Sequence, residues 1–205
     1  KSTALASTQA NNATGTQETR SLLAAKGSTQ TSIAQTTDAS NTQEYGYHGR
    51  FTSLPLVAGT YGSGTWTIAI GASESNAASN AFLALSVYFW RPSNSTVVGF
   101  VYDATTALGA EWATTETGVV TTFSGSNITI QNRDVLVVEI WRNQTQGNTN
   151  ARTNTLFYDG TTDPTNGTTT SDAASYINAP ADIPLLSIVT KTNIAFSSSG
   201  MYIYS

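Results

Sequence analysis

The 205-residue chain contains no cysteine and only one histidine, His48. A disulfide framework and a thiolate metal centre are therefore excluded, and one imidazole without a thiol leaves too few of the usual ligands for zinc. A hydrolytic triad would depend on His48, yet neither a Gly-x-Ser-x-Gly motif nor a histidine-rich metal signature accompanies it. We expect a protein that is not an enzyme, in which His48 has a structural role.

Charged residues are also scarce. Asp, Glu, Lys and Arg make up 11% of the chain, with a net charge of −4, whereas soluble proteins usually contain roughly 25%. Binding to phosphates requires clustered Lys and Arg, so nucleic acid is not expected as a partner. No apolar run is long enough to span a bilayer, so no membrane partner is expected either. The abundant Ser, Thr, Asn and Gln suit surfaces that pack against copies of themselves or lie outside cells.

Residues 1–44 are almost entirely small and polar, and we expect them to form an extended N-terminal arm without a core of its own. Within it, a short helix is predicted near residues 17–26, because Lys in a last turn and Gly just beyond it are helix stop signals. We expect the arm to become ordered on a neighbouring subunit. The apolar side chains available for that contact are Leu5, Leu22, Leu23 and Ile33.

Residues 45–205 carry recurrent short strand patterns and form the predicted main domain. In Thr65–Ile70, Trp66, Ile68 and Ile70 share one face, as in a half-buried strand. Ala81–Trp90 places apolar residues on both faces, which predicts a central strand. Short strands separated by long loops predict an all-β fold, a jelly-roll-like antiparallel β-sandwich, better than an up-and-down barrel.

The stretch Asn127–Trp141 predicts a strand, a turn and a second strand, arranged as a hairpin. Its polar misfit is Glu139, which shares a face with apolar residues of the second strand. A buried carboxylate requires a partner, and Arg91 and Arg142 are the candidates. We expect Glu139 to form a structural ion pair.

The loop from Asp159 to Gly167 has the oxygen density of a calcium loop, with Asp159 and Asp163 as candidate ligands. It lacks the spacing and the terminal Glu of an EF-hand, and Asp-Gly turns are common without metal. An ordinary turn is the favoured interpretation, and calcium is the only cofactor that the sequence suggests.

Trp112 is the one tryptophan in a predicted loop. Aromatic side chains in strands usually fill a core or an interface, so Trp112 is the best candidate for an exposed aromatic contact. A surface glycan is the partner that such a contact suggests.

Six motifs spread over residues 50–180 form a recognisable pattern. They are Gly-Thr-Trp-Thr-Ile at 64–68, Val-Tyr-Phe-Trp-Arg-Pro-Ser at 87–93, Thr-Phe-Ser-Gly-Ser at 122–126, Arg-Asp-Val-Leu-Val-Val-Glu-Ile-Trp at 133–141, Phe-Tyr-Asp-Gly-Thr at 157–161 and Ser-Asp-Ala-Ala-Ser-Tyr-Ile at 171–177. Together they resemble β-sandwich structural proteins of tailed bacteriophages and prophages. The resemblance implies a virion role such as capsid decoration, neck, tail or fibre, and it carries over no catalytic residue. Gly is the more usual residue where Arg133 stands, which predicts a different turn there.

The leading hypothesis is therefore a non-enzymatic virion structural protein, a homo-oligomer whose partners are itself and other virion proteins. The runner-up is a secreted cell-surface filament subunit, pilus-like, whose arm donates a strand to the next subunit. A third alternative is a carbohydrate-binding module or glycosidase fragment. The runner-up draws support from five Asn-x-Ser/Thr triplets, which would accept glycans in a secretory context. They begin at Asn12, Asn94, Asn127, Asn143 and Asn166.

Overall fold

The computed structural model describes residues 19–22, 25–36, 43–144 and 150–186. The described chain is almost entirely β-structure, and its one helical element is the short 3-10 helix η1 at Ala77–Ser79. Two five-stranded sheets and a two-stranded ribbon account for all twelve strands of this part of the chain. The predicted all-β sandwich is confirmed.

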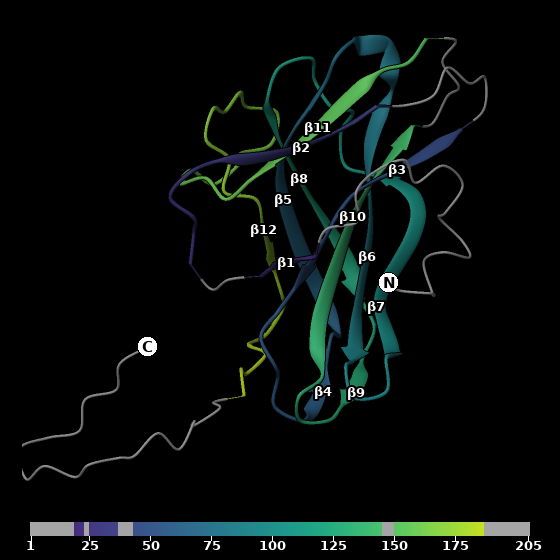
Figure 1. The fold of residues 1–205 in the computed structure, drawn as a ribbon, viewed down its shortest axis with the longest axis vertical. Coiled ribbons are helices and arrows are strands. Elements are labelled where there is room, and N and C mark those ends of the chain that lie inside the picture. Colours follow the sequence, from purple (N-terminus) through teal and green to yellow (C-terminus); the bar gives the residue numbers. More distant parts are fainter. Residues whose placement is uncertain (1–18, 23–24, 37–42, 145–149, 187–205) are drawn as a thin grey trace, which may run out of the picture.

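The first sheet, sheet A, has the order β1-β3-β10-β6-β7 (Figure 1). Apart from β1, which runs parallel to β3, its neighbours are antiparallel. Its strands are β1 (Thr19–Ser21), β3 (Glu44–Thr52), β10 (Val135–Gln144), β6 (Ala81–Arg91) and β7 (Thr96–Leu108).

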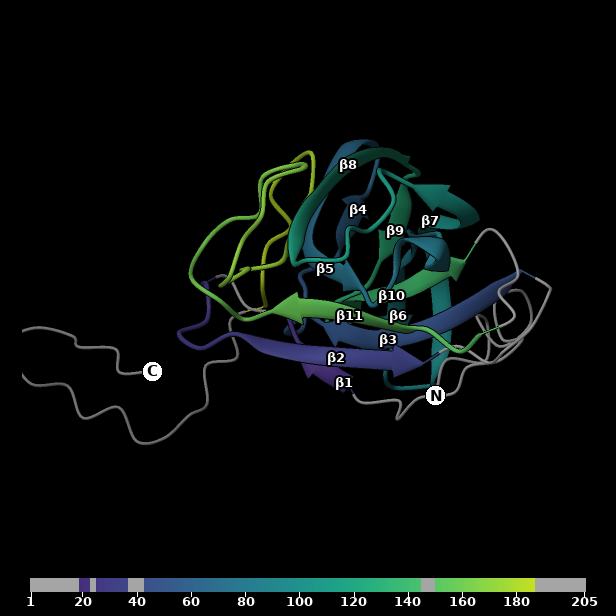
Figure 2. The same cartoon turned by 90° about the horizontal axis from the view of Figure 1, so that it is seen from above.

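The second sheet, sheet B, is antiparallel and has β5 near its middle. β8 pairs along most of β5, so β11 and β12 share the opposite edge of β5 one after the other, and β2 lies outside β11. Its strands are β2 (Thr31–Thr36), β11 (Thr153–Tyr158), β12 (Tyr176–Asn178), β5 (Gly64–Glu74) and β8 (Thr117–Gly125). Figure 2 shows the molecule turned by 90°.

The chain passes from one sheet to the other at each connection between the eight longer strands, except between β6 and β7. Those two form a hairpin whose turn spans residues 92–95. Such crossings between facing sheets are a feature of antiparallel β-sandwiches, and the jelly-roll arrangement stays a prediction.

The main core lies between the two sheets. Strand alternation places every second side chain of each strand inside, and the inward set includes Trp66 and Ile68 of β5, Phe89 of β6 and Val138 of β10. These side chains are at most 2% exposed. Burying one such residue contributes about 1.5–3 kcal/mol. In β5, where Trp66, Ile68 and Ile70 share one face, the alternation seen in the sequence therefore determines which face turns inward.

The predicted hairpin within Asn127–Trp141 is wrong in its pairing. The two strands exist, but β9 (Ile128–Ile130) pairs with β4 (Gly59–Tyr61) in the small ribbon, whereas β10 lies between β3 and β6. The turn between them explains this, because Arg133 has a φ of 76° and the Asp134 carboxylate accepts the amide of Gln131. The chain is thereby redirected from the ribbon into sheet A.

Two stretches of the predicted arm belong to the sandwich of the same chain. β1 pairs with Arg50–Thr52, and β2 pairs with the whole of β11. The short helix predicted near residues 17–26 is wrong for Thr19–Ser21, because the edge of β3 offers these residues hydrogen-bond partners, and Leu22 N continues the pairing to Thr52 O. Leu22 and Ile33 pack against the main core, whereas Leu5 and Leu23 lie outside the described residues.

Candidate interaction face

Sheet A carries a second apolar layer on the side that faces away from sheet B. We call this layer the outer face. Its central side chains are each at most 6% exposed, and less buried aromatic and aliphatic side chains surround them. The centre consists of Tyr47, Ala84, Tyr88, Val135, Val137 and Trp141, and the margin of Tyr45, Trp90, Val97 and Phe100.

A β-bulge in β3 places Tyr47 on this face. Ile140 pairs with Gly49 and Trp141 pairs with Tyr47, so His48 is the extra residue of the bulge. A bulge changes the face to which the following side chains point. Without the bulge, Tyr47 would share the inward face with Phe51. With the bulge, the Tyr47 ring packs edge-on against the Trp141 ring, with 4.8 Å between the ring centroids.

A buried ion pair lies within the outer face. Glu139 is 1% exposed, and its Oε1 accepts hydrogen bonds from Arg50 Nε at 2.7 Å and from the Tyr88 hydroxyl at 2.9 Å. The predicted ion pair of Glu139 is thus confirmed, but its predicted partners are wrong. Arg50 lies directly opposite Glu139 in the register of β3 and β10, a position that sequence spacing does not reveal.

Burial dominates the electrostatics of this group. It raises the pKa of Glu139, and the nearby Arg50 guanidinium and Tyr88 hydroxyl only partly offset this effect. Burial also raises the pKa of Tyr47, and the Glu139 carboxylate raises it further. For Arg50, Glu139 outweighs the opposing effect of burial and raises the pKa. Arg50 and Tyr47 therefore keep their protons near neutral pH, and the hydrogen bonds of Glu139 join β10 to β3 and β6.

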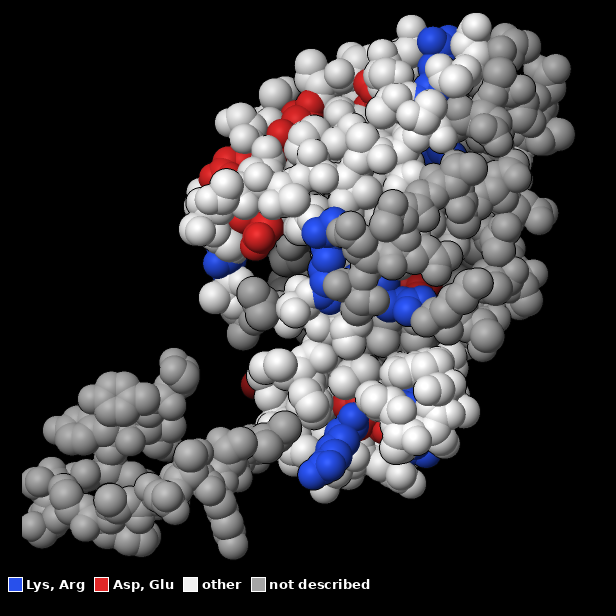
Figure 3. Space-filling view, in the orientation of Figure 1, with Lys and Arg blue, Asp and Glu red and all other residues white. Residues whose placement is uncertain are grey.

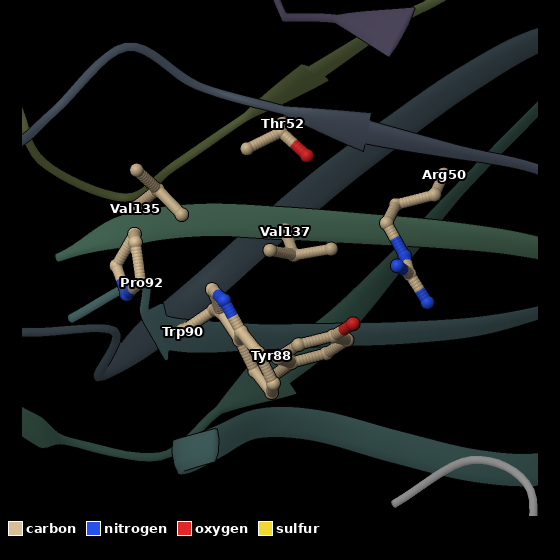
Figure 4. Close-up of a pocket in the computed structure, with 7 residues that line it drawn as sticks. All are labelled: Arg50, Thr52, Tyr88, Trp90, Pro92, Val135 and Val137. Carbon is tan, nitrogen blue, oxygen red and sulfur yellow. The ribbon is translucent and has the colours of Figure 1, made fainter. Parts of the chain in front are cut away.

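A half-open groove of about 290 Å³ lies in the outer face. Figure 4 shows Arg50 and Pro92 at its opposite ends, with Val137, Tyr88 and Trp90 between them. Its walls are mostly apolar, and Trp90 and Pro92 remain accessible at its rim. The groove can accept an apolar side chain, but it presents no array of polar groups that would orient a small polar substrate.

The two arginines predicted as partners of Glu139 have other roles. Arg91 pairs with Asp134 through two parallel hydrogen bonds of 2.9 and 2.8 Å, and although burial raises the pKa of Asp134, Arg91 holds it below its usual range. Arg142 is 2% exposed and donates to Gln144 Oε1 at 3.2 Å. A Cβ at Gly46 would lie 2.7 Å from Arg142 Nη2, so glycine provides the space that Arg142 needs.

The predicted exposure of Trp112 is wrong. Trp112 does lie in the loop between β7 and β8, but it is 1% exposed and its ring centroid is 5.3 Å from that of His48. The Trp112 amide donates to Ala81 O, which fixes the loop across the end of the sandwich. A sugar ring has no access to this indole, so the carbohydrate-binding alternative loses its main candidate contact.

His48 is buried with Trp112, and burial lowers the pKa of His48 to about 3. Its Nδ1 lies 3.2 Å from the Ile33 carbonyl oxygen of β2. The neutral imidazole thus connects the bulge of β3 to the neighbouring sheet, which is a structural contact.

The candidate calcium ligands lie in a loop with its own contacts. Asp163 Oδ2 lies 2.9 Å from Lys26 Nζ and forms an ion pair with it. Asp159 adopts a φ of 66°, as turn residues often do. In the described ranges, no three His, Cys, Asp or Glu side chains converge as metal ligands. Lys26, a residue of the predicted arm, provides the positive charge beside Asp163.

The outer face was only partly visible in the sequence. The apolar residues on both sides of Ala81–Trp90 indicated a covered strand, but Tyr47 and Arg50 were missed. The closely spaced tyrosines of Glu44–Thr52 were a weak signal, because the bulge at His48 alters the alternation on which such a prediction depends.

Comparisons with protein-family models, with curated proteins and with solved structures give no match for this chain. Within the part of the chain that the structure describes, no helix has the length and apolar character needed to cross a membrane.

Proposed function

We propose that this protein is a non-enzymatic structural subunit that assembles with copies of itself, and that the outer face of sheet A is a contact surface. The observation that carries the proposal is the apolar groove in the outer face, at whose rim Trp90 and Pro92 remain accessible. Accessible apolar patches of this kind often mark protein–protein contact sites.

The margin of the outer face provides the contact residues. Trp90, Val97 and Phe100 are partly accessible around the groove, and aromatic residues are enriched in the centres of protein interfaces. Figure 3 shows one side of the molecule, on which charged side chains are few and scattered among uncharged residues. Such surfaces lose little hydration energy when two copies meet.

The virion role comes from the resemblance to tailed-phage β-sandwich proteins, and we propose it as the setting of this assembly. In that role the subunit decorates a capsid or forms part of a neck, tail or fibre, with other virion proteins as further partners. Residues 1–18 precede β1 at the edge of sheet A, and we propose that they add contacts to a neighbouring copy.

The runner-up, a secreted filament subunit, is favoured by three sequons that are accessible to modification. Asn94, Asn127 and Asn166 are exposed, whereas Asn143 is 2% exposed and cannot carry a glycan in the folded chain. Mass spectrometry of the native protein decides between the two settings. Glycans at Asn94 support the filament, and their absence from all three exposed sites supports the virion.

Replacement of Trp90 tests the proposed contact surface. A lysine at the rim of the groove places an unpaired charge in the interface, so we expect Trp90→Lys to weaken self-association by a factor of about ten or more. The measurement is light scattering across a concentration series, with electron microscopy of the assemblies.

The matched control is Thr122→Lys, an equally charged change at an exposed position of β8 in sheet B. Both variants should keep the thermal stability of the parent within a few degrees. Parent-like assembly by Trp90→Lys, or a parent chain that stays monomeric at every concentration, would contradict the proposal.

A further inference from the structure

A second, larger groove lies between the edges of the two sheets, and we call it the edge groove. Its volume is about 620 Å³. Ser21 and Leu22, at the end of β1, line it from the side of sheet A, and Tyr176 and Ile177 of β12 line it from the side of sheet B. The groove is separate from the one in the outer face, with which it shares no residue.

This edge groove leads into the main core. A smaller recess of about 40 Å³ shares Leu22, Phe51 and Ile177 with the groove and also contacts Ile68 and Val138 of the core. An apolar side chain that enters the groove can therefore continue the packing of the sandwich interior, where each buried aliphatic residue contributes about 1.5–3 kcal/mol.

Both walls offer backbone partners for an additional strand. Among the described strands, β1 pairs only with β3, and β12 pairs only with β5. Each therefore has one strand edge without a neighbour in the described part of the chain. Unpaired edges beside an apolar groove accept an extended segment, whose main chain provides affinity and whose alternate side chains enter the groove.

The most exposed large apolar side chains of the described residues lie at the same place. Leu54 is 57% exposed and Leu185 is 48% exposed. Leu185 lines the edge groove, and Leu54 follows Ser53, which also lines it. The charged residues on its walls are Lys26, Asp159 and Asp163, so most of the groove is suited to an uncharged, apolar occupant.

The chain itself contains a segment of this kind. Residues 187–205, which lie outside the described residues, carry a single charge, Lys191. Ile194 and Phe196 are spaced to share one strand face, as are Met201 and Ile203. Fully extended, 19 residues reach roughly 60 Å.

The position of Leu186 indicates whose groove this segment enters. Pro184 and Leu186 are hydrogen-bonded to Val57 and Pro55, so the segment starts from the rim of the edge groove. The next six residues, Ser187–Thr192, contain no Gly, Pro, Asn or Asp, and Ser187 is the one residue among them of the types that favour turns. An extended run of this length carries the chain roughly 20 Å onward, which favours the groove of a second copy over its own.

We propose that residues 187–205 of one copy occupy the edge groove of a second copy as an added strand along β1 or β12. This inference rests on the proposed self-assembly and names a site and an occupant for it. Because the donor segment and the acceptor groove are different surfaces, the contact is head-to-tail and can continue from copy to copy.

Cross-linking between full-length copies tests the contact, and the absence of cysteine from the chain makes every introduced thiol unique. One preparation carries Asn178→Cys at the groove, and another carries Phe196→Cys in the segment. They are mixed, allowed to assemble and treated with a short bismaleimide. In the control mixture, Ser93→Cys in the β6–β7 turn replaces Asn178→Cys. We expect the yield of covalent dimers with Asn178→Cys to be at least about tenfold higher than in this control, because docking raises the effective thiol concentration.

Two further arrangements make the result independent of strand register and of chain origin. Ile188→Cys and Ile203→Cys replace Phe196→Cys in parallel mixtures. A double variant with Asn178→Cys and Phe196→Cys in one chain should give a ladder of multimers. If its main product is instead a monomer with an internal cross-link between positions 178 and 196, the groove is occupied by the chain's own segment and the proposal is overturned.

Dimer yields no higher than with Ser93→Cys at all three segment positions would also overturn it. Light scattering of the same mixtures separates this failure from that of the proposed function. Assembled material without cross-links refutes only the edge groove, whereas monomers at every concentration refute self-assembly itself.

Discussion

Two buried glutamates, Glu139 and Glu74, have different hydrogen-bond partners, and burial raises the pKa of both. Glu139 is held by Arg50 and Tyr88, whereas Glu74 of β5, 2% exposed, accepts a hydrogen bond from the Ala81 amide. Burial raises the pKa of Glu74 to about 7, the hydrogen bond from the Ala81 amide only partly offsets this rise, and Glu111 adds to it. Glu74 is therefore a residue through which pH acts on the stability of this fold near neutrality.

The sign of that effect follows from the pKa difference. The folded chain binds the Glu74 proton more tightly than the unfolded chain, so this contribution to stability is present below the ordinary pKa near 4.5 and is lost as pH rises toward 7. We expect Glu74→Gln to remove on the order of 2 kcal/mol of this pH dependence. The free energy of unfolding in urea, measured from pH 4 to 8, checks this.

Asp182→Asn, which removes an exposed carboxylate, is the matched control against which the effect of Glu74→Gln is compared. If the free energy of unfolding of Glu74→Gln falls between pH 4.5 and 7 as steeply as that of the parent, the Glu74 carboxylate is not the source of this pH dependence.

At the scale of elements, the turn before β10 is the point at which local sequence and backbone conformation disagree. Arg133 is exposed and adopts a φ of 76°, a left-handed conformation that costs a residue with a Cβ about 1 kcal/mol. Glycine adopts it without that cost, although it loses more conformational entropy on folding. Arg133 thus occupies, at this turn, a conformation that glycine adopts more readily.

We expect Arg133→Gly to stabilise the protein by up to about 1 kcal/mol. Arg133→Ala is the matched control, because it removes the same side chain and keeps the Cβ. Urea unfolding of the three chains gives the difference directly. Equal stability of the Gly and Ala variants would show that the left-handed conformation carries no cost here.

The bulge in β3 is a second element that determines the candidate site. The extra residue His48 turns inward beside Trp112, and Tyr47 turns outward beside Trp141. The alternation of β6 and β10 was predictable because both strands are regular, whereas the alternation of β3 was not. For this reason the apolar faces of the regular strands followed from the sequence, but the contribution of β3 to the outer face did not.

At the scale of the whole molecule, the chain before residue 45 has two roles. β1 and β2 complete the sheets of their own copy, so the part available for contacts elsewhere is residues 1–18. Deletion of residues 1–44 removes two strands, and we expect an unstable product. Deletion of residues 1–18 alone should keep the parent's thermal stability and weaken assembly.

Circular dichroism during heating and light scattering at fixed concentration test these two deletions together. Parent-like assembly by the shorter deletion would remove residues 1–18 from the proposed contact and leave the outer face and the edge groove as the candidates.

The sequence by itself determined the all-β class, the inward face of β5, the coverage of β6 on both faces, and the need of Glu139 for a buried partner. These features depend on spacing along one strand or on the chemistry of one residue, which are local properties. Only the tertiary structure decided that β9 pairs with β4, that Arg50 and not Arg91 or Arg142 reaches Glu139, and that Trp112 is covered. Each of these depends on the register between strands far apart in the chain, and that register is set by a bulge, a left-handed residue and the packing of two sheets together.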